Sequence, residues 1–170
     1  MNSVSFIRRI DDLGRIVIPK EIRKKLKIRE NEVLEIFNDD DRIIVKKHNE
    51  IDNNMKVINM YGNIIRKLTN KNIIITNNHN IIYTNSLIKD TFFNKEITDL
   101  AIDILNNRTI KEGYEFELIM NVKINNYLIY PLIVNSDVLG LIILFSDEQI
   151  SDKDRTLLLL VSKILNVCLE

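Results

Sequence analysis

The segment from residue 6 to residue 48 constrains the fold most, because it places four short β-patterned runs and one short helix in very few residues. A unit of this size is near the lower limit for folding alone when it has neither a disulfide nor a structural metal. The chain has a single cysteine, Cys168, and no Cys/His spacing that suits zinc. We therefore expect the segment to complete its core with a second copy, as an obligate dimer.

The pattern of this segment predicts a strand, a turn, a second strand, a helix and a hairpin, in that order. Pro19 marks the start of the helix, because the missing amide proton of a proline has no intrahelical partner at the first position. The predicted ranges are Phe6–Ile10, Asp11–Gly14, Arg15–Ile18 and Lys20–Ile28, then Glu32–Phe37 and Arg42–Lys46 for the strands of the hairpin.

Positive charge is concentrated in the first part of this segment, although the whole chain has a formal net charge of zero. Residues 6–29 contain nine basic side chains and three acidic ones, a local net charge of +6. Residues 1–48 contain 12 basic and 9 acidic side chains, whereas residues 49–170 contain 12 and 15. A basic surface of this kind favours a polyanion as partner, although most basic clusters are simply solvated.

Three arginines are the best placed for DNA, because a guanidinium can grip a phosphate or a guanine edge with two hydrogen bonds. Arg8 and Arg15 flank the predicted turn, and Arg23, with Lys24, lies on the exposed side of the predicted helix. On the charge pattern alone, DNA binding and a solvated surface are about equally supported.

Residues 51–69 predict a helix with apolar side chains on two sides. It suits a signalling coiled coil and an ordinary core helix about equally. Gly62 lies inside the pattern, at a cost of up to roughly 1 kcal/mol in helix propensity.

Downstream, the pattern changes to a hairpin around residues 77–80, a helix, three strands and a closing helix that begins at Ser151 with Asp154 in capping-box spacing. This order predicts an α+β domain with an antiparallel sheet. The helix is expected at Thr98–Asn107, the strands at Tyr114–Met120, Tyr127–Val134 and Val138–Phe145, and their turns at Asn125-Asn126 and Asn135-Ser136-Asp137.

The string R-R-I-D-D-L-G-R-I-V-I-P-K-E-I-R from Arg8 to Arg23, followed by L-E-I-F and I-V-K-K, resembles the AbrB/SpoVT family of bacterial transition-state regulators over about 45 residues. The resemblance implies a swapped-hairpin dimeric β-barrel that presents basic side chains to double-stranded DNA. Lys24 stands where the family often has arginine, which keeps the charge and loses the bidentate geometry. The DNA-binding residues implied in this way are Arg8, Arg9, Arg15, Lys20, Arg23 and Lys24.

The second half resembles a GAF domain, at Tyr130–Val134 and Val138–Ser146. We therefore expect a DNA-binding domain at residues 1–50, a linking helix at 51–69 and a GAF-like regulatory domain at 70–170, with dimers through the N-terminal domain and tetramers through the helix and the GAF-like domain. The resemblance implies a sequence-specific transcription regulator of sporulation-stage genes, cytoplasmic, on the nucleoid of the forespore. The alternatives are an antitoxin with the same type of N-terminal domain, or a GAF small-molecule sensor for which DNA is incidental.

We do not expect an enzyme, because the sequence lacks G-x-x-x-x-G-K, G-x-G-x-x-G, G-x-S-x-G and H-E-x-x-H. No cofactor and no metal site are expected, and no apolar run is long enough to span a membrane. The sequence leaves four points open: whether the GAF-like domain has a ligand, which operator sequence is bound, whether the protein activates or represses transcription, and whether it is a dimer or a tetramer.

Overall fold

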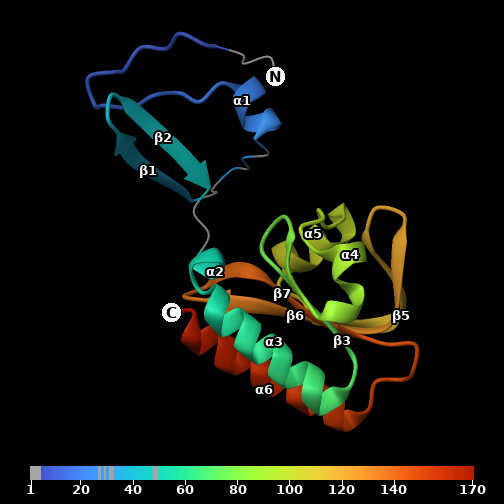
Figure 1. The fold of residues 1–170 in the computed structure, drawn as a ribbon. Coiled ribbons are helices and arrows are strands. Elements are labelled where there is room, and N and C mark those ends of the chain that lie inside the picture. The colour runs from blue at the N-terminus through green and yellow to red at the C-terminus, as the bar shows by residue number, and fades with distance from the viewer. Residues whose placement is uncertain (1–4, 27, 29, 31–32, 48–49) are drawn as a thin grey trace. The chain divides into compact units, whose positions relative to one another are not determined.

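The computed structural model describes residues 5–26, 28, 30, 33–47 and 50–170. The chain divides into two compact units, which we call the head (residues 1–48) and the C-terminal unit (residues 49–170) (Figure 1). Some residues used in the predictions lie outside the described residues: Lys27, Arg29, Glu32 and His48.

The predicted hairpin of the head is confirmed. Strands β1 (Leu34–Asp39) and β2 (Arg42–Lys47) are antiparallel, with a register that runs from Leu34 opposite Lys47 to Asp39 opposite Arg42. Asp40 and Asp41 form the tip, where Asp40 has a φ of 50°. Aspartate is one of the few residues that enter this region of backbone space readily, which suits it to a tight reversal.

Helix α1 (Lys20–Lys25) follows Pro19, as expected, but it is shorter than predicted. Pro19 is the N-cap, with a ψ of 146°, rather than the first helical residue. The predicted end at Ile28 is wrong, because the amide of Ile28 bonds to the carbonyl of Arg23, a spacing of five residues that does not continue an α-helix.

The predicted turn at residues 11–14 is confirmed, but the strands predicted on either side of it are wrong for the single chain. Neither Phe6–Ile10 nor Arg15–Ile18 belongs to a strand in the described structure. A strand needs a neighbouring backbone to take its amide and carbonyl groups. The sheet described in the head contains β1 and β2 alone, and neither of the two predicted segments pairs with its edges.

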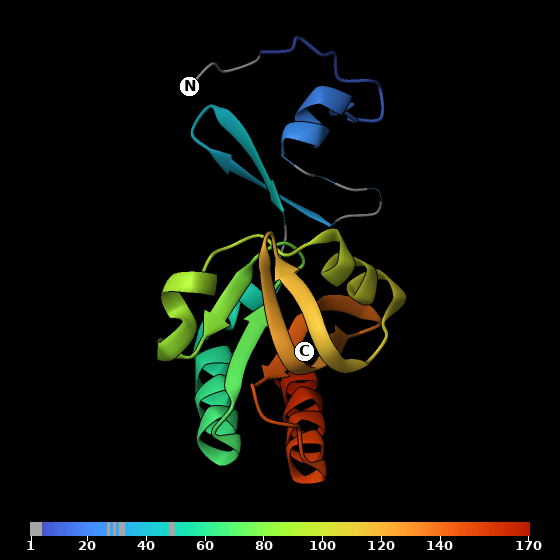
Figure 2. The same ribbon diagram turned by 90° about the vertical axis from the view of Figure 1, so that its right-hand side faces the viewer.

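The C-terminal unit is built on a five-stranded antiparallel sheet, which confirms the α+β class and its antiparallel sheet (Figure 2). The strand order is β4-β3-β7-β6-β5, so that the first strand of the unit pairs with the last one. The strands are β3 (Asn72–Thr76), β4 (Ile81–Thr84), β5 (Lys111–Ile119), β6 (Val122–Val134) and β7 (Asp137–Phe145).

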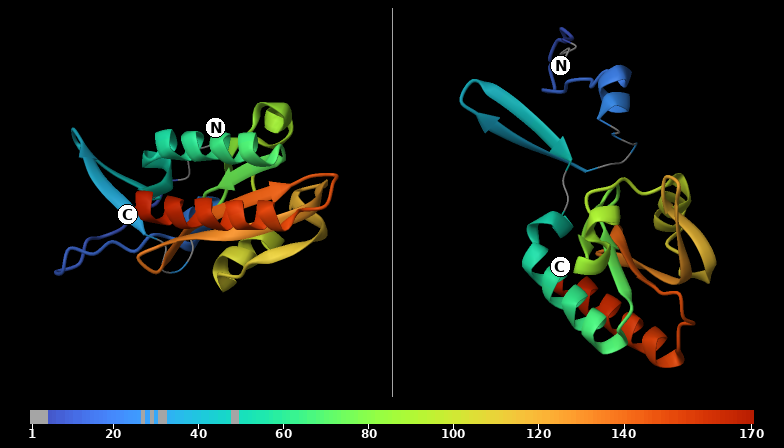
Figure 3. Two further views of the ribbon diagram at one scale, coloured as in Figure 1. Left: turned by 90° about the horizontal axis from the view of Figure 1, so that it is seen from below. Right: turned by 45° about the vertical axis from the view of Figure 1, so that its right-hand side comes forward.

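Helices cover both faces of this sheet. On one face, α3 (Met55–Thr69) and α6 (Asp152–Cys168) lie side by side and antiparallel (Figures 1 and 3). The other face carries α4 (Lys89–Phe92) and α5 (Asp99–Asn107), with the short 3-10 helix η1 (Ser86–Ile88) before α4. Each face has its own cluster of buried apolar residues, so the unit encloses two cores around one sheet.

The predicted linking helix is present in two pieces, α2 (Glu50–Asn53) and α3, with a break at Asn54. Ile51, Ile58 and Ile65 are fully buried in the core beneath it. A β-carbon at Gly62 would overlap the ring of Tyr83, and the glycine therefore allows this ring to lie against the helix.

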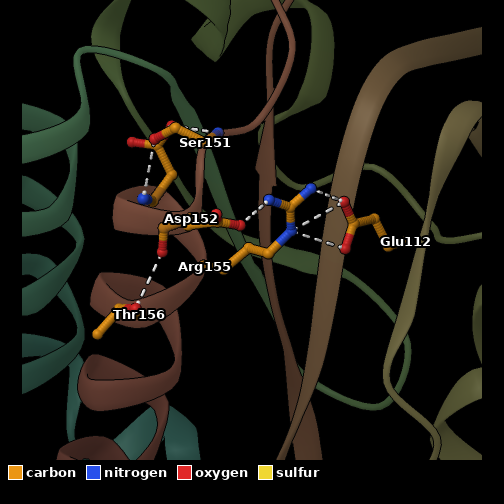
Figure 4. Close-up of polar contacts among 6 residues, drawn as sticks. Glu112, Ser151, Asp152, Arg155 and Thr156 are labelled. Atoms are coloured by element: carbon orange, nitrogen blue, oxygen red, sulfur yellow. Dashed lines mark hydrogen bonds and ion pairs between the residues drawn. The ribbon is translucent and has the colours of Figure 1, made fainter.

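The capping box of α6 is confirmed. The amide of Asp154 donates to Ser151 Oγ at 3.2 Å, and the amide of Ser151 donates to Asp154 Oδ2 at 3.0 Å. In the same first turn of α6, Arg155 Nε donates to both carboxylate oxygens of Glu112 at 3.1 Å, and Nη1 donates to Asp152 at 2.7 Å (Figure 4). These charge-assisted bonds connect α6 to β5.

The turn predicted at Asn125-Asn126 is wrong. The chain reverses instead at Met120 and Asn121, and Asn126 lies inside β6. Its φ of 35° is held by the side chain, whose Nδ2 donates to the carbonyls of Ser146 and Asp147 at 3.2 and 2.9 Å. Asn126 therefore has a positive φ here without reversing the chain. The short helices η1 and α4 were not predicted.

Candidate nucleic-acid interface

The turn at residues 11–15 of the head is held by hydrogen bonds among its own residues. Gly14 N donates to the carbonyl of Asp11 at 3.0 Å, and Asp11 N donates to the carbonyl of Arg15 at 3.2 Å. The Asp11 carboxylate accepts from the amides of Leu13 and Arg15 at 3.1 and 2.8 Å through Oδ1, and from Arg15 Nε at 2.7 Å through Oδ2.

These bonds keep the Asp11 carboxylate charged. The amide of Arg15, followed by its guanidinium, lowers the pKa of Asp11 below its ordinary value, against a smaller opposing effect of burial. The amide of Leu13 acts in the same direction. At neutral pH the turn thus holds an anion against the Arg15 guanidinium.

The six predicted DNA-binding residues all lie in the head, in two groups. Arg8, Arg9 and Arg15 are exposed on the stretch that contains the turn. On α1, Lys20 and Lys24 are exposed and Arg23 is half-buried, within the basic last turn of this helix. We call the six the basic cluster: Arg8, Arg9, Arg15, Lys20, Arg23 and Lys24.

Two further cations of the head were not singled out from the sequence. Lys25 is exposed in the last turn of α1, and the charge count was the signal that could have found it. Lys46 on β2 pairs with Glu35 at 3.1 Å and lies over the ring of Phe37, 5.1 Å from its centre. Its charge is therefore partly neutralised inside the hairpin.

The head leaves most of its apolar side chains in contact with solvent. Pro19 is the single buried residue among those whose side chains are described there. Ile7 is 93% exposed, Val17 75% and Ile36 68%. A hollow of about 350 Å³ opens on the same unit, lined mainly by apolar residues that include Ile16, Ile18 and Leu26.

The C-terminal unit has a second hollow, of about 290 Å³, beside the pair formed by Glu112 and Arg155. Tyr114, Asn126 and Gln149 add polar groups to its lining. Within the described part of the chain, no group of three or more His, Cys, Asp or Glu side chains is arranged to hold a metal ion. Among the described helices, none has the length and apolar character needed to cross a membrane.

Residues 54–166 match the family model described as stage V sporulation protein T C-terminal, transcription factor. The chain is also 31% identical to stage V sporulation protein T of Bacillus subtilis (strain 168) over 155 residues, which cover 88% of this chain and 87% of that protein. The chain belongs to the stage V sporulation protein T family. The resemblance found in the sequence is thereby confirmed.

Three further similarities concern parts of this chain. The transition state regulatory protein AbrB of Bacillus subtilis (strain 168) is 50% identical over 48 residues, 28% of this chain and 50% of that protein. Residues 7–52 also match the model described as antidote-toxin recognition MazE, bacterial antitoxin. A crystal structure of the GAF domain from an Acinetobacter phosphoenolpyruvate-protein phosphotransferase has a TM-score of 0.56 at 10% identity, and covers 73% of this chain and 84% of that one. The last similarity confirms the GAF-like fold.

Proposed function

We propose that two chains pair through their heads and bind double-stranded DNA with the basic cluster, as a sequence-specific regulator of transcription during sporulation. The observation that carries this proposal is the exposure of the basic side chains on both sides of the turn, in a member of a transcription-factor family. Cations on a folded frame neutralise phosphates and release condensed counterions, and arginines can also read guanine edges.

The exposed apolar residues of the head support pairing of two chains. A soluble chain seldom leaves so many large apolar side chains in water, since covering them is the main driving force for association. The stretches around residues 6–10 and 15–18 lack a strand partner in the single chain, and a second chain could supply one. The same pairing would bring two copies of the basic cluster onto one duplex.

The salt dependence of DNA binding tests this function. If a dimer sets about eight basic side chains against phosphates, affinity should fall on the order of a thousandfold or more between 50 and 200 mM salt. Arg15→Ala should weaken binding about tenfold or more, because a bidentate contact is lost in each chain. Lys67→Ala removes an exposed charge from α3 and is the matched control, expected to leave affinity unchanged. A flat salt response, or equal effects of the two substitutions, would contradict the proposal.

An antitoxin is the second candidate, because residues 7–52 match a bacterial antitoxin model. Antitoxins of this type usually carry a disordered tail that wraps around the toxin. Here the head is followed by a folded unit with two cores, which favours regulation over toxin capture. Deletion of the gene should then be viable and should alter transcripts, whereas loss of an antitoxin would release a lethal toxin.

The C-terminal unit suits a regulatory role in this proposal. Its GAF-like fold could sense a small molecule, and α3 and α6 expose Met60, Leu68, Leu160 and Val167, which could join two dimers into a tetramer. We assign no enzymatic activity to it, and we place the protein in the cytoplasm, on the nucleoid of the forespore. Solution mass of the full chain, with and without α6 substitutions such as Leu160→Asp, distinguishes dimer from tetramer.

A further inference from the structure

Asp11 is an acidic residue that lies between Arg9 and Arg15 in the sequence, two members of the basic cluster. Its carboxylate lies four residues before Arg15 and bonds to the Nε of that arginine at 2.7 Å. A negative charge beside a surface that faces phosphates should by itself weaken DNA binding, because it repels the ligand. The presence of Asp11 at this position therefore needs a structural reason.

The geometry points to Asp11 as a positioning residue that aims the Arg15 guanidinium at DNA, an inference that rests on the proposed function of the head. Asp11 accepts a hydrogen bond from Nε, and among the described residues no hydrogen bond or ion pair occupies Nη1 or Nη2. These two nitrogens are the pair that can bind a phosphate or the O6 and N7 of guanine end-on. Holding the side chain in advance removes part of the entropy cost of ordering it on the duplex.

The two carboxylate oxygens of Asp11 have separate tasks, and one substitution can therefore separate them. Oδ1 accepts hydrogen bonds from the amides of Leu13 and Arg15 and so closes the turn, whereas the partner of Oδ2 among the described residues is the guanidinium. Asp11→Asn keeps an oxygen for the two amides and replaces the other oxygen with a donor group. The variant thus preserves the turn and loses the contact with Arg15.

The experiment compares Asp11→Asn with Asp12→Asn in the full-length chain. Asp12 is the exposed neighbour, and its substitution removes the same charge. The probes are the duplex that the wild-type chain enriches most from a random-sequence pool, and poly(dI-dC) as non-specific DNA, both measured by fluorescence anisotropy. We expect Asp11→Asn to weaken binding of the enriched duplex about threefold to tenfold, with unchanged or tighter binding of poly(dI-dC). Asp12→Asn should bind both as tightly as the wild type, or more tightly.

The sign of the effect decides the matter. Charge repulsion alone predicts tighter binding for both variants, so an Asp11→Asn chain that binds the enriched duplex as well as the Asp12→Asn chain overturns the inference. A wild-type chain that binds neither duplex, or an Arg15→Ala chain that binds normally, would instead contradict the proposed function. The two failures are therefore distinguishable.

A second measurement separates aiming from a general effect on folding. In an Arg15→Lys background, which lacks the Nε contact and the paired nitrogens, Asp11→Asn should change affinity no more than Asp12→Asn does. An equal loss in both backgrounds would make Asp11 a structural residue of the turn and would overturn the inference.

Discussion

The head and the C-terminal unit place their apolar side chains in opposite ways. In the C-terminal unit, residues such as Ile74, Ile75 and Leu141 have no exposed surface. In the head, Ile7, Val17 and Ile36 are largely exposed, although all three belong to β-patterned segments. The same kind of sequence pattern thus leads to an enclosed core in one unit and to an open surface in the other.

The difference lies in the number of layers that one chain supplies. The C-terminal unit has a sheet of five strands with helices on both faces, so both faces of the sheet meet other elements of the same chain. The head has one hairpin and one helix of six residues, too little to form a second layer. In the proposed function, the apolar side chains exposed in the head are surface for the second chain, whereas those exposed in the C-terminal unit lie outside its two cores.

The strongest way to break this comparison is to place a charge at Ile16, which lines the hollow of the head. Ile16→Asp should abolish the folded dimer of the head, because a dimer interface cannot hold an unpaired carboxylate. Leu87→Asp in η1 is the matched control, since Leu87 is more exposed than Ile16. This substitution should change the free energy of unfolding of the protein by less than about 0.5 kcal/mol. Circular dichroism and solution mass measure both. Equal tolerance of the two charges would show that the head needs no partner.

A second substitution tests whether the C-terminal unit is independent of the head. A β-carbon at Gly140 on β7 would overlap the backbone carbonyl oxygen of Thr76 on the neighbouring β3. Gly140→Ala should therefore lower the free energy of unfolding of this unit by about 3 kcal/mol or more, since backbone atoms cannot move aside. Hydrogen exchange should show reduced protection of the amides in the five-stranded sheet, while the amides of the β1–β2 hairpin keep their protection. A loss spread over both units would show that they unfold together.

The smallest expected effect concerns the bonds between Glu112 and Arg155 at the edge of the sheet. Hydrogen bonds from Arg155, and then its charge, lower the pKa of Glu112. A carboxylate whose pKa is lowered in the folded state stabilises the fold at pH values above its ordinary pKa of 4.5. This contribution is lost as the pH falls through the folded-state pKa. Glu112→Gln should therefore lower the melting temperature slightly, by roughly 1–2 °C at pH 7, and by less near pH 3. A difference that does not shrink in acid would mean that the pair acts through packing.

Sequence patterns located the elements whose partners lie within the chain. The β1–β2 hairpin, α5, β7 and the capping box at Ser151 all follow from local signals that the neighbouring residues reinforce. The strands expected at Phe6–Ile10 and Arg15–Ile18 do not form in the single chain. The sequence pattern indicates extended backbone but does not identify the strand with which it pairs. The turn predicted at Asn125-Asn126 was wrong for another reason. The Asn126 side chain bonds to the carbonyls of Ser146 and Asp147, far along the sequence, and these bonds fix the backbone conformation there.

The role of the basic cluster in DNA binding stays a prediction, and its members were located by charge and by a long matching string. The contact between Asp11 and Arg15 was not predicted, because a carboxylate in a turn is explained well enough by its bonds to backbone amides. Only the geometry shows that the second oxygen of Asp11 faces the guanidinium.

Helix α3 begins within a few residues of the head, yet its side chains help to fill the core of the C-terminal unit. A chimaera that exchanges heads between relatives should accordingly be spliced ahead of Ile51, where no core residue is divided. A splice at residue 70 would remove α3, one of the two long helices on this face of the sheet, and would uncover the Tyr83 ring that lies against it.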